Sequence, residues 1–322
     1  MTPAPGTRIP PASVLAETPL PTASPERRAG TDLLLFAIPS VIWGTTWLAI
    51  KFQLGSVAPE LSVGWRFALA ALLLAGFCAA RGVSLRFGAA DHARLALLGV
   101  LLFGLNYVLV YRSEQVLTSG LVAVLFAMLV FLNLLGGRLF LGATAPGAVW
   151  AGAVLGVSGV AFVFWPELKA VRGGGAEAVG IAEGLAATVL ASAGNLFSQR
   201  LFGRGIGVVP GTALAMGYAS LLVILGCAAT GVRFSFDLHP SYLVSLVYLA
   251  LFGSVVAFVS YLTLVRRVGA GRSGYSAAVI PVVAMLASTL FEGYRWTGTA
   301  LAGMGLVLAG TVLVLRARSR AA

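Results

Sequence analysis

Long apolar windows are the feature that most constrains this chain, because about 20 mainly apolar residues cross a bilayer as one α-helix. Lipid offers no hydrogen-bond partner to backbone groups, so each such window is predicted to be helical. The windows predict an all-α integral membrane protein with ten transmembrane helices. They cover residues 32–54, 61–80, 94–112, 116–137, 146–165, 179–200, 209–230, 240–264, 272–291 and 297–315.

Composition agrees with a membrane location. Hydrophobic residues make up 59% of the chain and charged residues only 10%, with a mean hydropathy of +0.95, whereas a typical soluble domain has about 25% charged residues. The net charge of +11 is spread between apolar runs and forms no basic patch, which argues against nucleic-acid binding. Arg residues concentrate at the window ends that an intracellular N-terminus places inside. With an even number of spans, both termini are therefore predicted to be cytoplasmic.

The chain repeats itself at a nearly constant offset. A shift of 150 residues places WGTTWLAIKFQLG (43–55) on AGNLFSQRLFGRG (193–205), and a shift of 151 aligns 140–160 with 291–311. Five spans per half is an odd number, so the second half enters the membrane in the opposite orientation, as in secondary transporters with inverted repeats. The predicted organisation is a disordered cytoplasmic tail (1–31), a first repeat (32–165), an extracytoplasmic linker (166–178), a second repeat (179–316) and a cytoplasmic tail (317–322).

Polar and aromatic side chains follow stripes on four of the predicted helices, spaced at 100° per residue. Such side chains usually face a bundle interior or a wet cavity. The alternative is that they join helices or form interfacial aromatic belts. The residues we expect along a substrate pathway are Trp43, Trp47, Lys51, Arg66, Phe103, Tyr107, Tyr111, Asn195, Gln199, Ser254, Phe258 and Tyr261.

Charges within the windows need separate treatment. Lys51 and Arg66 lie near extracytoplasmic span ends, where both either snorkel or pair with Glu60 or Glu114. Lys51 is also placed to attract the carboxylate of a departing substrate. Glu183 lies within a window but opposite the polar stripe of its helix. Since no acidic residue lies near the middle of a window, we expect facilitated transport or exchange, without a proton carrier.

Motifs of soluble enzymes are missing or out of context. GAGRSG (269–274) matches GxGxxG but joins two predicted spans, with no strand before it. We find no catalytic constellation and expect no enzyme activity, no metal and no cofactor.

The sequence resembles the drug/metabolite transporter superfamily, specifically EamA-type exporters. The resemblance rests on WGTTWLAIK (43–51), WRFALAALLL (65–74), and Pro281 followed by Glu292. The first repeat departs from the pattern, with Val130 and Leu141 at the positions of Pro281 and Glu292. The resemblance implies two inverted five-helix EamA repeats in the inner (plasma) membrane.

The leading hypothesis is an inner-membrane exporter of small amphipathic metabolites, working by alternating access. Amino acids, aromatic ones among them, and drug-like compounds are the expected substrates. Its expected partners are a small-molecule substrate and the lipid bilayer, with the protein a monomer or homodimer. One alternative is an exchanger of phosphorylated metabolites or nucleotide sugars. The other is a non-transport membrane scaffold or membrane enzyme.

Overall fold

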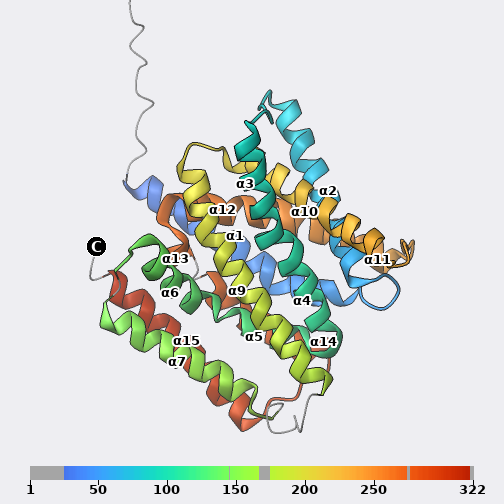
Figure 1. Ribbon diagram of the computed structural model, residues 1–322. Coiled ribbons are helices and arrows are strands. Elements are labelled where there is room, and N and C mark those ends of the chain that lie inside the picture. The colour runs from blue at the N-terminus through green and yellow to red at the C-terminus, as the bar shows by residue number, and fades with distance from the viewer. Residues whose placement is uncertain (1–24, 145, 167–174, 274–275, 320–322) are drawn as a thin grey trace, which may run out of the picture.

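The computed structural model describes residues 25–144, 146–166, 175–273 and 276–319, and these ranges contain helices but no strand (Figure 1). Most of the predicted terminal tails and of the predicted linker lies outside the described residues. The first half contains α1 (Pro25–Lys51), α2 (Pro59–Ala80), α3 (Ala89–Gly99), η1 (Val100–Gly104), α4 (Leu105–Val116), α5 (Ser119–Phe126), α6 (Leu129–Leu141) and α7 (Gly147–Val163). The second half contains α9 (Ala176–Gly203), α10 (Val208–Ala229), α11 (Pro240–Tyr248), η2 (Leu249–Val256), α12 (Ala257–Val268), α13 (Ala270–Ser273), α14 (Ser276–Phe291) and α15 (Gly298–Ser319).

Seven helical stretches in the described ranges are long and apolar enough to cross a membrane. Three shorter apolar helices, at Gly147–Val163, Ile280–Phe291 and Gly298–Leu313, accompany them. The predicted all-α membrane fold is confirmed. The count of ten spans stays a prediction, because the three shorter helices fall below the length that crosses a bilayer without help.

The two halves share irregularities as well as helices. In each half the third long helix contains a π-helical segment, η1 at Val100–Gly104 and η2 at Leu249–Val256, and the shift of 150 residues superposes them. The turn after the first helix of each half contains a glycine with positive φ, Gly55 at 106° and Gly205 at 97°. These glycines are also matched by the shift. Since only glycine adopts such backbone readily, both halves need it for the same turn.

Contacts between the halves are reciprocal. Helix α1 packs against η2, α12 and α14 of the second half, and α9 packs against η1, α4, α5 and α6 of the first. Likewise α2 packs on α10, and α7 packs on α15. Helices α7 and α15 lie side by side at one edge of the molecule (Figure 1). They approach closely, since a Cβ on Gly159 would lie 2.6 Å from the Gly303 carbonyl oxygen. Small residues at this crossing permit the close packing.

Candidate functional site

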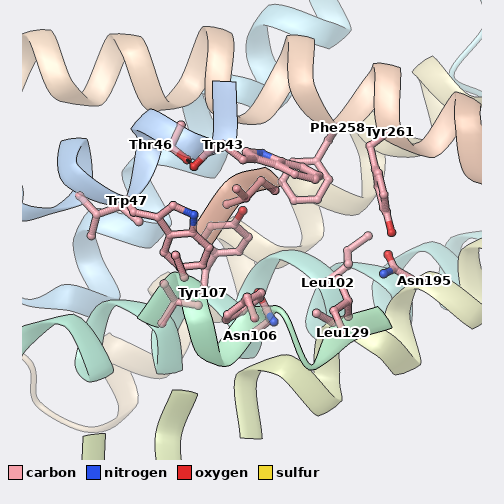
Figure 2. Close-up of a pocket in the computed structure, with 16 residues that line it drawn as sticks. Trp43, Thr46, Trp47, Leu102, Asn106, Tyr107, Leu129, Asn195, Phe258 and Tyr261 are labelled. Atoms are coloured by element: carbon pink, nitrogen blue, oxygen red, sulfur yellow. Dashed lines mark hydrogen bonds between the residues drawn. The ribbon is translucent and has the colours of Figure 1, made fainter. Parts of the chain in front are cut away.

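A small cavity lies where the two halves meet. Its volume is about 60 Å³, far below the roughly 300 to 1,000 Å³ of typical small-molecule sites. The walls come from α1, η1, α4, α5, α6, α9, α12 and α14, so both halves contribute. The lining residues include Trp43, Thr46, Trp47, Ile50, Leu102, Asn106, Tyr107, Val110, Phe126, Leu129, Asn195, Phe258, Tyr261 and Ile280 (Figure 2).

Aromatic rings form much of the wall and hold one another in place. The Trp43 ring lies 4.9 Å from that of Phe258 and 5.1 Å from that of Tyr261, while Trp47 lies 5.0 Å from Phe126. The Trp43 indole N–H donates to the Gly253 carbonyl at 3.1 Å. This bond ties α1 to η2 and fixes the ring, which stands against Phe258 in Figure 2.

Some of the lining residues also carry buried polar atoms without a hydrogen-bond partner among the described residues. Within the described residues, Trp47 Nε1 and Asn195 Oδ1 have no hydrogen-bond partner. One is a donor and the other an acceptor, and they come from α1 and α9, the equivalent helices of the two halves. Aromatic walls with a few free polar groups are the usual lining of a site for a small organic molecule.

Arg66 of α2 lies directly behind this wall, with an exposed fraction of 1%. Its Nε donates to Ser254 Oγ at 3.0 Å and its Nη1 to Tyr111 Oη at 3.5 Å. The guanidinium carbon lies 4.6 Å from the centre of the Tyr107 ring, a cation–π contact. The expectation that Arg66 snorkels or pairs with Glu60 or Glu114 is wrong. It is buried because the second helix packs with this face inward, against the third helices of both halves.

Lys51 is the centre of a polar cluster one helical turn beyond the Trp47 wall. Its Nζ donates to the backbone carbonyls of Glu114 at 2.5 Å and Leu117 at 2.7 Å, and lies 3.6 Å from Glu292 Oε1. The ammonium therefore connects the ends of α1, α4 and α14. Pairing with the Glu60 or Glu114 carboxylate was one of the alternatives for Lys51. Its ion pair is instead with Glu292, because α14 of the second half packs along α1.

Glu292 is held from several sides. Its carboxylate accepts from the Ser119 backbone N–H at 3.1 and 3.2 Å, from Ser119 Oγ at 2.5 Å and from Ser288 Oγ. Ser119 is the first residue of α5, so the carboxylate also meets the positive end of a helix dipole. We call Lys51, Glu114, Ser119, Ser288 and Glu292 the Lys51 cluster. It closes one end of the cavity.

Amide side chains lie at the opposite end of the cavity, one turn beyond the lining residues Leu129 and Asn195. Gln199 Oε1 accepts from the Ala270 backbone N–H at 2.9 Å. Asn133 Nδ2 donates to the Ala270 carbonyl at 3.4 Å. These bonds join α6, α9 and α13, and we call this region the Gln199 end. The bonds at Ala270 involve neutral groups only, and the ion pair on this side, Arg267 Nε with Asp32 Oδ1 at 3.0 Å, lies farther from the cavity along α12 and α1.

Comparisons with known proteins agree with this architecture. The model of the EamA-like transporter family matches residues 31–165 and 178–316. The chain belongs to the EamA-like transporter family. Its two matched segments carry the two structural halves. Members of the family are transporters, so this protein is a membrane transporter and not an enzyme.

Individual relatives are similar over most of their length. YedA of Escherichia coli K12, described as an uncharacterized inner membrane transporter, is 28% identical over 281 residues, 87% of this chain and 89% of YedA. A probable amino-acid metabolite efflux pump of the same organism is 24% identical over 290 residues, 87% of this chain and 93% of the pump. A solved crystal structure matches with a TM-score of 0.70 at 18% identity, covering 91% of this chain and 99% of that one, which shows a shared fold.

The predicted pathway residues divide into two groups in this EamA-like transporter. Trp43, Trp47, Tyr107, Asn195, Phe258 and Tyr261 line the cavity. The others lie around it: Lys51 at one end, Gln199 at the other, and Arg66, Tyr111 and Ser254 in the hydrogen-bonded layer behind Tyr107. Phe103 is fully buried behind the wall, 4.8 Å from Phe258 and 5.4 Å from Phe67.

Some residues of the site could not be predicted from the polar and aromatic stripes. Phe126 and Leu129 lie at the break between α5 and α6, in a window without a polar stripe. Asn106 lines the cavity beside Tyr107, and its Nδ2 donates to the Ala187 carbonyl at 2.5 Å. Glu292 appeared only as part of the family resemblance. Its pairing with Lys51 depends on the fold.

Proposed function

We propose that this EamA-like transporter exports small amphipathic metabolites across the inner membrane by alternating access. Amino acids, aromatic ones especially, are the proposed substrates, with both termini in the cytoplasm and the Lys51 end facing outward. The observation that carries the proposal is the aromatic cavity between the halves, with its unpaired Trp47 Nε1 and Asn195 Oδ1. Flat apolar walls suit aromatic or aliphatic side chains, and the free polar atoms suit an amino or carboxyl group.

The size and closure of the cavity support alternating access. A volume of about 60 Å³ is too small for a metabolite, so binding requires that one end opens. The Lys51 cluster and the Gln199 end provide one closure on each side of the cavity. In alternating access, each half moves against the other around a central site. One of the similar proteins, the probable amino-acid metabolite efflux pump, supports the proposed direction and substrate class.

The exchange of phosphorylated metabolites has less support. Phosphate recognition ordinarily uses Arg or Lys side chains that reach the ligand. The described lining of the cavity contains neither, and Arg66 is turned toward Ser254 and Tyr111 behind Tyr107.

Flux measurements in proteoliposomes test the proposal. Purified protein is reconstituted and assayed with radiolabelled phenylalanine, tryptophan, leucine, a cationic drug and glucose 6-phosphate. We expect saturable flux of the aromatic amino acids, reduced by unlabelled tryptophan, and no flux of the sugar phosphate. Flux of glucose 6-phosphate alone would replace the proposed substrate class, and flux no faster than in empty liposomes for every compound would overturn it.

A further inference from the structure

Glu114 is the most unusual titratable residue of the described chain. It lies in the last turn of α4, one turn beyond the cavity residue Val110, and its exposed fraction is 0%. Neither carboxylate oxygen has a hydrogen-bond partner among the described residues. Every other member of the Lys51 cluster is bonded through its side chain. Glu114 contributes only its backbone carbonyl, which accepts from Lys51.

An ionised carboxylate in this position would be strongly disfavoured. Removing a charge from water without a paired donor costs several kcal/mol or more, and buried groups then become neutral. A protonated carboxyl group is far cheaper to bury. From this geometry we infer that Glu114 is the proton-coupling site of the transporter, protonated while both ends are closed on an empty cavity and ionised when an open end admits water. The inference rests on the proposed transport function.

The charged groups around Glu114 are already committed elsewhere. Lys51 of α1 is paired with Glu292 of α14, at 3.6 Å, so a charge on Glu114 would also face the Glu292 carboxylate. Arg66 of α2 favours a negative charge nearby. However, it donates to Ser254 and to Tyr111, and it forms no ion pair within the described residues. Among the described residues, Glu114 therefore forms no ion pair with either cation.

Opening changes these surroundings. Separation of α1 and α14 from α4 breaks the contacts of Lys51 with the Glu114 and Leu117 carbonyls and admits water. Hydrated Glu114 then releases its proton to that water, and the carboxylate balances the charges of Lys51 and Arg66. Before the end closes again, the carboxylate takes up one proton from water on that side. When the Gln199 end opens instead, water in the cavity reaches Glu114 past Val110, and the proton leaves to the other side. Glu114 then stays ionised while the substrate crosses, and it is reprotonated only at the open Lys51 end.

Each cycle thereby moves one proton inward as one substrate molecule moves outward. Transport without a proton carrier was expected from the sequence because only the position of each carboxylate along its span was known. Burial inside the bundle, which follows only from the packing of α1, α4 and α14, is what makes Glu114 a proton carrier.

The pH dependence of the opening can be measured without any substrate. Spin labels are attached to cysteines at Phe52 and Val179, exposed by 55% and 54%, after Cys78 and Cys227 are replaced by Ala. Both positions lie at the Lys51 end, because Val179 precedes Gly180, which packs on Val116 and Leu117. Double electron–electron resonance in lipid nanodiscs then gives the distance between the labels. We expect the long-distance, open population to grow as pH rises, by up to about tenfold in the open-to-closed ratio per pH unit for one proton.

Glu114→Gln removes the titration while keeping the size of the side chain. We expect the short, closed distance to remain the main population of this variant at every pH. Glu183→Gln is the matched control, because Glu183 is a partly exposed carboxylate paired with Arg112 at 3.6 Å, and it should follow the wild type. A pH response that persists in Glu114→Gln, or a wild type without one, would overturn the inference. Infrared spectra of the wild type provide a check that needs no variant at the site, since the band of a protonated buried carboxyl group should disappear as pH rises.

A transport arm separates this inference from the proposed function. Proteoliposomes containing a pH-sensitive dye receive a phenylalanine gradient. We expect proton movement with wild type and Glu183→Gln, and flux without proton movement, at least tenfold slower, with Glu114→Gln. If phenylalanine does not move but the label distance still responds to pH through Glu114, the substrate proposal fails and the proton site stands. If phenylalanine moves with no proton in the wild type, the proton site fails alone.

Discussion

The two ends of the cavity are related by the repeat but closed by different chemistry. At the Lys51 end, an ammonium group, the Glu292 carboxylate, two serines and two backbone carbonyls join α1, α4, α5 and α14. At the Gln199 end, two amide side chains bond the backbone of Ala270. The repeat offsets place Leu201, Leu264 and Leu141 where the Lys51 end has Lys51, Glu114 and Glu292. Next to the cavity, similar helices thus carry an ionic closure at one end and a neutral one at the other, with the Arg267–Asp32 ion pair lying farther out on the neutral side.

This difference indicates how an inverted repeat acquires a direction. If both ends were closed by equivalent groups, the protein would treat the two sides of the membrane alike. Only the different solutions on the two sides would then set a direction. A closure made of charged groups changes in strength when a carboxylate gains a proton or when its ion-pair partner moves away. Hydrogen bonds between amide side chains and the backbone do not depend on protonation at ordinary pH. We therefore expect the Lys51 end to be the regulated closure and the Gln199 end to follow it.

The largest expected effect, an all-or-none difference in labelling, tests which side of the membrane each end of the cavity faces. Ser56 follows α1 at the Lys51 end and Arg204 follows α9 at the Gln199 end, and both are exposed. In a background without Cys78 and Cys227, a cysteine at Ser56 should react with an impermeant maleimide added to intact cells. A cysteine at Arg204 should react only after permeabilisation, because Arg residues concentrate on that side. The reverse pattern would mean that the Lys51 end faces the cytoplasm and the Gln199 end faces outward. Labelling of both cysteines from outside would contradict the prediction that α1 and α9 span the membrane in opposite directions.

Removal of the central cation should have the next largest effect. Lys51→Met leaves the Glu292 carboxylate without its cation and two carbonyls without a donor. Loss of one partner of a fully buried pair costs about 3 to 5 kcal/mol. Since the Lys51 side chain is 28% exposed, we expect a loss of about 2 kcal/mol in the free energy of unfolding. Thermal unfolding in detergent measures it.

The matching control combines Lys51→Met with Glu292→Gln. The double variant should recover part of the lost stability, because no unpaired carboxylate remains. A double variant as unstable as the sum of the single variants would show that Lys51 and Glu292 are not coupled, and the Lys51 end would then be closed by packing alone.

The cavity between the ends is tested by Trp47→Ala. Trp47 lines the cavity, and we expect flux of tryptophan per folded molecule to fall about tenfold, which equals about 1.4 kcal/mol of lost binding. The control is Trp65→Ala, because Trp65 lies outside the cavity, where its ring packs on Phe236. Unfolding temperatures of both variants are measured in parallel. If Trp65→Ala lowers flux equally, or if Trp47→Ala lowers stability while flux per folded molecule is unchanged, Trp47 belongs to a packing face and not to the substrate site.

The sequence predicted this cavity wall better than the closures of its ends. Trp43, Trp47, Phe258 and Tyr261 share faces of helices that follow the regular 100° spacing, so their common orientation could be deduced. Phe103 and Ser254 lie within η1 and η2, where a π-helical turn shifts the register. A stripe drawn with α-helical geometry therefore placed them on the wall, although both lie behind it.

The pairing of charges could not be predicted from the windows. Lys51 and Glu292 are far apart in sequence, and their meeting depends on α14 packing along α1, a contact between the two halves. The burial of Arg66 and Glu114 likewise depends on which face of α2 and α4 points inward. Both residues lie near span ends in the sequence, where exposure to water is the usual expectation. Tertiary packing buries both residues instead.

The smallest effect is expected at the neutral closure. Gln199→Leu removes one hydrogen bond, from the Ala270 N–H, and leaves that donor without its present partner; such a loss costs about 1 kcal/mol. We expect a decrease of that size in the free energy of unfolding, about half that of Lys51→Met. The variant should still show the pH-dependent distance change between labels at Phe52 and Val179, because the titrating group lies at the other end. A weaker Gln199 end should also open more often, raising the leak of phenylalanine from loaded proteoliposomes modestly, by about fivefold for 1 kcal/mol. If Gln199→Leu instead abolished the pH response of the Lys51 end, the two ends would share one closure, and the contrast between a charged, regulated end and a neutral, following end would be wrong.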